Sequence, residues 1–310
     1  MPFLQFPRRI AVFLCLFSLI LLRVRPILGQ TRDPPEEKKP QRIVSLTLGS
    51  DEILLSLVDP KRIVAVTHLA VDPKVSHVAE ASKAIPNRIQ AGLEQVVALR
   101  PDRVITASYT PADVVNQLKE AGLPVERLEF FPSVDGIKQN IRAVGKAVGE
   151  EKRAEALVAE MERRLRQIAE RVAGSRRRTV LFYSPTGVVA GKGTTFDEIA
   201  TLAGARNLAA VAGIVGHQKI SAERLIELDP EIILVSDWNP EEPDFDRKVI
   251  SDPALQSLSA VRNRRVVIVP EKNLSTVSQY IVNGVEEIAR VIHPERFAPP
   301  VQGDIKRTTP

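Results

Sequence analysis

The sequence predicts an α/β protein with two Rossmann-like lobes, each built on a mainly parallel sheet flanked by helices, joined by a long linking helix. Two observations support this prediction. One pattern of helix, proline and β-branched strand occurs twice along the chain, and a charged helical segment lies between the two copies. The chain has 310 residues, 44% of them hydrophobic and 26% charged, which is ordinary for a globular protein of this size.

The N-terminus has the features of a secretory signal. Arg8 and Arg9 precede the apolar run Ile10–Leu22, which is shorter than the ~20 residues of a membrane-spanning helix and suits the core of a signal peptide. We expect a signal peptide over residues 1–29, with an uncleaved N-terminal anchor as the alternative. The single cysteine, Cys15, lies inside this run, so the remaining chain has no disulfide, which an oxidising compartment tolerates.

The remaining chain divides into segments of different composition. Charged and proline-rich residues, typical of a solvated linker, precede the first ordered run and recur at the C-terminus. We expect a linker over 30–41, an N-terminal lobe over 42–133, a linking helix over 134–173, a C-terminal lobe over 174–298 and a tail over 299–310.

The repeated unit is clearest when Gly92–Tyr109 is compared with Ser221–Trp238. In each copy, apolar residues at helical spacing are followed by a proline and then by a short β-branched run. The residue before a proline is disfavoured in the right-handed helical region, so each helix should end there. The β-branched runs, at 103–106 and 232–235, are typical of buried parallel strands.

A second pairing supports the duplication. Arg42–Leu46 resembles Arg178–Phe182, and a helix beginning with Asp-Glu-Ile follows each of these strands. The C-terminal copy has a longer connection, Tyr183–Thr195, which we expect to be a loop at the carboxyl end of a strand. Ligands bind at this edge of open α/β sheets. Between the lobes, apolar residues at helical spacing over Val134–Val172, with a break near Gly149, predict one long helix or two in line.

Several other functions receive little support from the residues. The net charge is +5, but the arginine-rich runs at 176–178 and 262–265 are not interleaved with aromatics as in a nucleic-acid site, so we expect no nucleic-acid partner. The segment Ser184–Thr195 fails as a phosphate loop because the spacing between its glycines is short and Lys192 is followed by Gly193. The acidic pairs Asp51–Glu52 and Asp197–Glu198 are interpreted as helix N-caps and dipole complements.

Taken together, these segments resemble the helical-backbone solute-binding proteins of ABC importers that receive iron chelates and cobalamin. The resemblance covers about Arg42–Phe297. Its main motifs are RIVSLTLGSDEILLSL at 42–57, GKGTTFDEIATLAGARNLA at 191–209 and GIVGHQKISAERLIELDPEIILV at 213–235. It implies a monomeric, periplasmic, non-catalytic protein that captures a ferric siderophore, cobalamin or haem and delivers it to a permease dimer driven by a separate ATPase. No resident cofactor is implied.

The resemblance also assigns candidate residues. Glu94 and Glu223, one in each repeat, match the family's glutamates that pair with arginines of the permease. Aromatic and basic residues at strand ends or in loops expected to face the cleft are candidates for stacking on a chelate, ligating its iron or offering charge to it. They are His68, Arg88, Tyr109, Tyr183, Phe196, His217, Trp238 and Tyr280. The sequence departs from many relatives in having His217 where they have tryptophan, and the segment Thr67–Asp72 where they have tyrosine.

Two alternatives remain open from the sequence. The first is a receptor for bare zinc or manganese, in which His68 and His217 would be the metal ligands; His77 and His293 complete the histidines of the chain. The second is an enzyme or assembly subunit that uses the same scaffold around a metallocofactor. An export signal argues against the second, because such assemblies are usually cytoplasmic.

Overall fold

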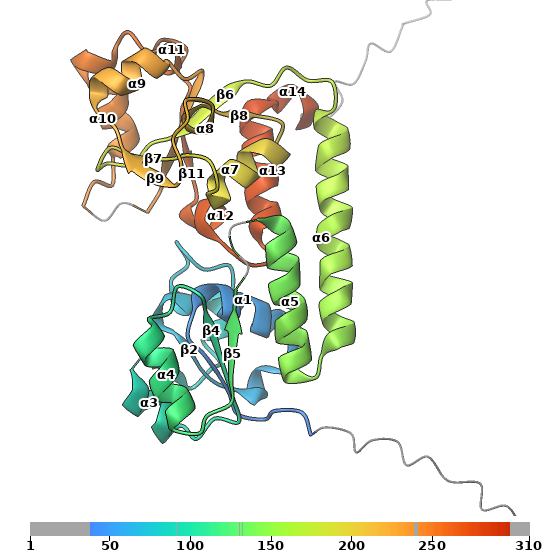
Figure 1. The fold of residues 1–310 in the computed structure, drawn as a ribbon. Helices are drawn as coiled ribbons and strands as arrows, with labels where there is room; N and C mark the ends of the chain where they lie inside the picture. The colour runs from blue at the N-terminus through green and yellow to red at the C-terminus, as the bar shows by residue number, and fades with distance from the viewer. Residues whose placement is uncertain (1–37, 91, 130, 132, 239–240, 298–310) are drawn as a thin grey trace, which may run out of the picture. The chain divides into compact units, whose positions relative to one another are not determined.

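The N-terminal lobe, in the lower part of Figure 1, is built on a parallel sheet whose strands follow the order β3-β2-β1-β4-β5. The computed structural model describes residues 38–297 apart from 91, 130, 132 and 239–240. The predicted signal peptide, most of the linker and the C-terminal tail therefore lie outside the described residues. The strands are β1 (Ile43–Ser45), β2 (Ile63–Thr67), β3 (Asn87–Ile89), β4 (Arg103–Ala107) and β5 (Val125–Leu128).

Helices cover both faces of this sheet because its strands alternate apolar residues toward two separate clusters. Ile43, Ile63 and Ile105 pack with α1 and α5, whereas Val44 and Val104 pack toward α3 and α4. These helices are α1 (Leu48–Leu57), α3 (Leu93–Ala98), α4 (Ala112–Glu120) and α5 (Val134–Val148), with the short α2 (Ala79–Ser82) and the 3₁₀ turns Pro60–Arg62 and His68–Val71 between them.

The C-terminal lobe repeats this arrangement with a parallel sheet in the order β11-β10-β6-β8. Its strands are β6 (Thr179–Phe182), β8 (Arg206–Asn207), β10 (Ile232–Ser236) and β11 (Val266–Val269). Its helices are α7 (Thr195–Leu202), α8 (Leu208–Val211), α9 (Ala222–Leu228), α10 (Phe245–Ser251), α11 (Ser259–Arg262), α12 (Glu271–Ser275), α13 (Ile281–Ile292) and α14 (Pro294–Phe297), with a 3₁₀ turn at Pro253–Leu255.

The internal duplication is visible in the pairing of the strands. β1 pairs in parallel with β4, and its counterpart β6 pairs in parallel with β10. The two repeat helices end in the same way, because Arg100 and Asp229, each just before a proline, have positive φ values of 47° and 46°. The residue before proline therefore leaves the right-handed region as predicted, but it enters the left-handed region, which stops the helix in each copy.

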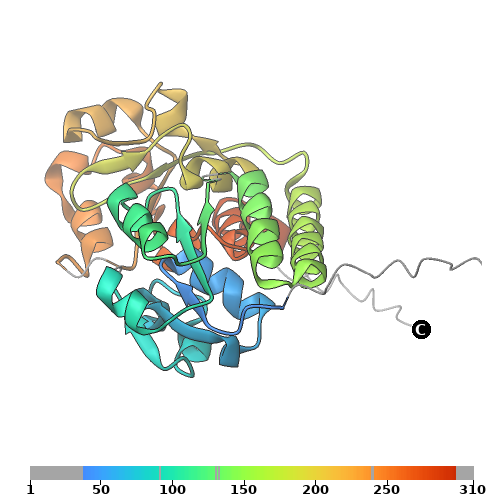
Figure 2. The same ribbon diagram turned by 60° about the horizontal axis from the view of Figure 1, so that its bottom comes forward.

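The linking segment differs from the prediction of one helix or two in line. α5 ends at Gly149, whose φ of 70° reverses the chain, and α6 (Glu151–Val172) runs back antiparallel to α5. The ion pairs Lys138–Glu162 and Arg142–Glu155 establish this direction, since partner numbers fall along α6 as they rise along α5. Both ribbon views show the two helices side by side (Figure 2). Periodicity predicted the helices but could not predict the reversal at a left-handed glycine.

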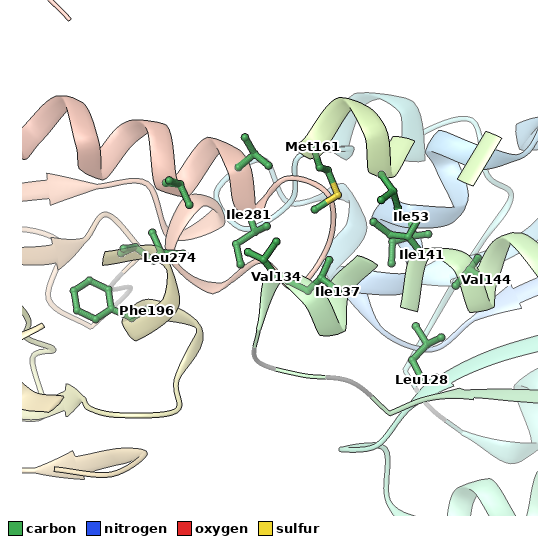
Figure 3. Close-up of a cluster of buried hydrophobic side chains, with 14 of the residues drawn as sticks. Ile53, Leu128, Val134, Ile137, Ile141, Val144, Met161, Phe196, Leu274 and Ile281 are labelled. Carbon is green, nitrogen blue, oxygen red and sulfur yellow. The ribbon is translucent and has the colours of Figure 1, made fainter. Parts of the chain in front are cut away.

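α6 is the element that links the lobes. Near its start Arg153 donates to the carbonyl oxygen of Leu57 at 2.8 Å, and further along Arg164 donates to Asn283 and Glu286 of α13 at 2.9 and 3.0 Å. One hydrophobic cluster continues from Ile53 and Ile141 to Ile281 and Phe196 (Figure 3). Because the described residues from Lys39 onward form one compact unit with this shared core, we expect limited movement between the lobes.

Candidate functional site

A hollow of about 190 Å³ opens in the C-terminal lobe. It lies where β6 and β11 end and α7 and α12 begin, so it is at the carboxyl edge of the parallel sheet, where ligands bind in open α/β folds. It brings together two residues predicted from the sequence, Phe196 and His217. The hollow is lined by Phe182, Ala190, Thr195, Phe196, His217, Glu271, Leu274 and Ser275.

Two phenylalanines form the apolar wall of the hollow. Phe196 is in the first turn of α7, which begins there because the Thr194 side chain accepts a hydrogen bond from the amide of Asp197. Its ring is buried and lies 5.9 Å from that of Phe182, at an interplanar angle of 47°. This pair is held by the shared core and forms a rigid apolar wall of the hollow.

His217 reaches the hollow from a short antiparallel ribbon. The connection Tyr183–Thr195, predicted to be a loop, contains β7 (Val188–Ala190), which pairs with β9 (His217–Lys219) so that His217 lies opposite Ala190. Gly191 is required beside the ribbon, because a Cβ there would lie 2.2 Å from the carbonyl oxygen of Ile214. The glycine thus permits close backbone approach, and the His217 side chain stays exposed to solvent.

Glu271 supplies the acidic group of the hollow and was missed in the sequence analysis. Burial raises the pKa of its carboxyl group, although hydrogen bonds from Ser236 and Ser275 act in the opposite direction. Its backbone amide donates to Asp237 at 2.8 Å, which fixes the start of α12 after β11. The available signal was positional: Glu271 follows a strand, just as His68 and Tyr109 do, but it belongs to no repeated motif.

The other C-terminal candidates lie outside the lining of this hollow. Tyr183 packs against Phe245 of α10, with ring centroids 5.8 Å apart, and burial raises the pKa of its hydroxyl. Trp238 follows β10 and is 40% exposed. Tyr280 stacks on His77 at 4.5 Å and 19°, where the two lobes meet. Tyr280 therefore has a partner within the protein.

The N-terminal candidates divide in the same way. His68 is exposed at the carboxyl end of β2. Tyr109 is 58% exposed and packs on Phe131 at 5.3 Å. Burial raises the pKa of its phenol, although a hydrogen bond with the Thr47 side chain acts in the opposite direction. Arg88 donates to the backbone carbonyls of Ser82 and Asn87, at 2.6 and 3.1 Å, and to that of Ile85. Its guanidinium group thus already donates hydrogen bonds to backbone carbonyls of its own lobe.

Glu94 and Glu223 occupy equivalent exposed positions in the first turns of α3 and α9. Hydrogen bonds from the Ser221 hydroxyl and its own backbone lower the pKa of the Glu223 carboxyl group. Within the part of the chain that the structure describes, neither carboxylate forms an ion pair, although the exposed Arg224 next to Glu223 is paired with Glu227. The two repeats thus present one unneutralised glutamate each.

The interpretation of Asp51–Glu52 as N-caps was wrong, although Asp51 does lie in the first turn of α1. Thr47 caps α1 by accepting from the amide of Ser50, and both acidic side chains are completely buried. Asp51 accepts from the Thr67 hydroxyl at 2.5 Å, and burial raises its pKa to about 7. Periodicity could not reveal this, since the partners of both carboxylates come from distant parts of the chain.

Glu52 joins the two lobes. One carboxylate oxygen accepts from the backbone amide of His77 at 2.9 Å, and the other accepts from the hydroxyls of Thr276 and Ser278 at 2.8 and 2.5 Å. Burial raises the pKa of this carboxyl group against the effect of those donors. The His77 ring, whose pKa burial lowers to about 4, hydrogen-bonds the carbonyl of Lys272 at 2.9 Å beside it.

A site for a bare metal ion needs three or four converging ligands. Among residues 38–297, excluding those whose positions are not described, no group of three or more histidine, cysteine, aspartate or glutamate side chains lies together in this way. His68 is not part of the hollow that His217 lines.

Over the same described residues, no helix has the length and apolar character needed to cross a membrane.

The fold and the hollow define a class: a two-lobed α/β protein with a hollow at the carboxyl edge of a parallel sheet. The family model described as periplasmic binding protein matches residues 43–273, and the chain belongs to that family. This confirms the family resemblance seen in the sequence.

Individual relatives extend over most of the chain. The uncharacterized ABC transporter substrate-binding lipoprotein YvrC of Bacillus subtilis is 28% identical over 278 residues, 87% of this chain and 85% of the relative. A cobalamin-binding protein of Halobacterium salinarum is 26% identical over 83% of this chain and 70% of its own length. The periplasmic haem-binding protein RhuT of Roseiflexus superimposes with a TM-score of 0.73 at 28% identity, covering 83% of this chain and 99% of that chain.

Proposed function

We propose that this protein is the extracytoplasmic solute-binding component of an ABC importer and that it captures a metal chelate of the ferric siderophore, haem or cobalamin type, without catalysis. The observation that carries the proposal is the hollow in which Phe196 and His217 converge, in a chain of the periplasmic binding protein family. The export signal predicted over residues 1–29 supports a periplasmic location, and the named ligands of two relatives support the class of cargo.

The chemistry of the hollow favours a flat chelate. The apolar wall formed by the partly buried Phe182 and the buried Phe196 suits contact with the edge of a macrocycle, and the exposed imidazole of His217 is a suitable axial ligand for its metal. At about 190 Å³ the hollow is smaller than the ~300–1,000 Å³ of pockets that enclose a whole ligand. A bound chelate would therefore extend beyond it, and His68 and Tyr109 are our candidates for contacts from the other lobe.

The test is a titration of the purified protein with haem, cobalamin, ferric hydroxamate, ferric catecholate, ferric citrate and Zn²⁺, followed by the fluorescence of Trp238. We expect saturable quenching by one of the chelates, and a roughly tenfold or greater loss of affinity in His217→Ala or Phe196→Ala. Gln218→Ala is the matched control, because successive strand residues point to opposite faces. A response to Zn²⁺ alone would instead favour the bare-metal alternative.

For Glu94 and Glu223 we propose docking onto a permease dimer. One free carboxylate at equivalent positions of two repeats suits a partner with two-fold symmetry and complementary arginines, and such exposed pairs mainly set orientation and association rate. The double variant Glu94→Ala/Glu223→Ala should abolish uptake in cells while ligand affinity stays unchanged. The control Glu120→Ala/Glu170→Ala makes the same change in charge. Loss of ligand affinity in the first variant, or equal uptake by both variants, would contradict this role.

A further inference from the structure

The two arginine-rich runs of the sequence lie together at one edge of the C-terminal sheet, opposite the edge where Phe196 and His217 line the first hollow. Arg176–Arg178 precede β6, and Arg264 and Arg265 precede β11. Because β6, β10 and β11 are parallel, their amino ends share one edge. The arginines line a hollow of about 630 Å³ there, whose walls are Arg176, Arg178, Glu231, Asn263, Arg264, Arg265 and Pro294.

The charge of this hollow, which we call the arginine hollow, is strongly positive. Four guanidinium groups face one carboxylate, that of Glu231, which pairs with Arg176 at 2.7 Å. Glu231 also accepts a hydrogen bond from the backbone amide of Thr179, the first residue of β6, at 2.7 Å, so its carboxylate binds both an arginine and the backbone. Burial and the nearby charge of Arg178 lower the pKa of Arg265, while the carboxylates of Glu231 and Glu295 act in the opposite direction.

Helix capping accounts for only part of the cluster. Arg178 donates to the carbonyl of Ile292, and Arg265 donates to that of Val291 at 3.5 Å, where both support the C-terminus of α13. Each guanidinium group has five N–H donors, so most of them remain for a ligand. Arg264 has no such role, yet it is exposed and has a φ of 55°, a left-handed conformation that asparagine or glycine adopts more readily.

We propose that the arginine hollow is a binding site for a phosphate-class oxyanion. Guanidinium groups recognise such anions through paired, charge-assisted hydrogen bonds, and several of them around one concave surface favour an anion with more than one negative charge. The proposal is independent of the chelate site, because the two hollows lie at opposite ends of the C-terminal strands. The phosphate belongs either to a soluble phosphate compound or to the headgroup of an anionic lipid.

The experiment compares two variants with the same loss of positive charge. Arg176→Gln/Arg264→Asn removes the two exposed arginines and retains the pair that supports α13; asparagine tolerates the left-handed conformation at 264. Arg166→Gln/Arg247→Gln changes exposed arginines on α6 and α10 and is the control. Each protein is titrated calorimetrically with inorganic pyrophosphate and floated with phosphatidylcholine vesicles that either contain or lack phosphatidylglycerol.

Saturable pyrophosphate binding that the first variant weakens roughly tenfold or more, and the control does not, would support the proposal and identify a soluble source. Flotation that depends on phosphatidylglycerol and is lost in the first variant alone would support it with a lipid source. Glu231→Gln should tighten either interaction, because it removes the carboxylate of the hollow and keeps an acceptor for Thr179. Absence of both interactions, or equal behaviour of the two double variants, would overturn the proposal.

Discussion

The buried carboxylate of Glu52 should be a main determinant of stability where the lobes meet. In Glu52→Ala the His77 amide and the hydroxyls of Thr276 and Ser278 lose their common acceptor. The hydroxyls already lie 2.9 Å from each other and can pair, whereas the amide has no such replacement. A buried donor without an acceptor costs about 1–3 kcal/mol, and the lost packing adds to this, so we expect a decrease of roughly 3–5 kcal/mol in the free energy of unfolding.

Glu52→Gln separates the hydrogen bonds from the charge. The amide oxygen can still accept from His77, and the amide NH₂ can donate to the two hydroxyls, which rotate to accept. Burial already disfavours the ionised carboxylate, as its raised pKa indicates. Replacing it with a neutral group should therefore change stability by less than about 1.5 kcal/mol.

Urea unfolding followed by Trp238 fluorescence measures both variants, with the exposed Glu120→Ala as control. The slope of unfolding free energy against urea should be the same for all, so that shifts in the midpoint report stability. If Glu52→Gln is as destabilising as Glu52→Ala, the charge itself holds the junction and the hydrogen-bond argument fails. If Glu52→Ala costs less than about 1 kcal/mol, the junction does not depend on this residue.

Two further predictions concern buried positions. Burial raises the pKa of Asp51 to about 7, above that of an unfolded chain, so the folded state holds an extra proton between pH ~4 and ~7 and stability falls as the pH rises through that range. This titration should lower the free energy of unfolding of the unmodified protein by about 3 kcal/mol between pH 5 and 8, and Asp51→Asn should abolish that decrease. Urea midpoints at the two pH values measure it; parallel curves of stability against pH for both proteins would contradict the prediction. Replacing glycine by alanine stabilises an ordinary helix, but Gly284→Ala should lower the melting temperature of this protein. The alanine Cβ would lie 2.1 Å from the carbonyl oxygen of Asn273, so the two helices would have to separate. An unchanged or higher melting temperature would show that α12 moves aside easily.

The sequence predicted those elements whose signals are local. The strands at 103–107 and 232–236 were found because a proline and a β-branched run mark each copy of the repeat, and the confirmed pairing of β1 with β4 and β6 with β10 follows the same duplication. The antiparallel hairpin of α5 and α6 was not found, because apolar spacing is the same whether a helix continues or reverses at Gly149.

The parts of the site that were missed depend on contacts between distant segments. Asp51 and Glu52 look like solvated first-turn acids in one dimension, and only the fold brings Thr67, His77 and Ser278 to them. Glu271 likewise enters the hollow because β11 ends beside β10, in the same sheet as β6. Phe196 and His217 were predicted as pocket candidates together with Tyr183 and Tyr280, and the sequence could not separate the first two from the last two, which pack against partners within the protein.

The same contacts bear on how the protein would recognise its ligand. A core shared by both lobes, a long α6 fixed to each of them and a carboxylate buried between them all resist large closure. In a protein that closes only slightly, little binding free energy is spent on rearrangement, and selectivity must come from side chains already in place. If the proposed function is right, we expect substitutions at Phe196, His217 and Glu271 to change which chelate is bound, and substitutions at Glu52 to alter stability and leave that choice the same.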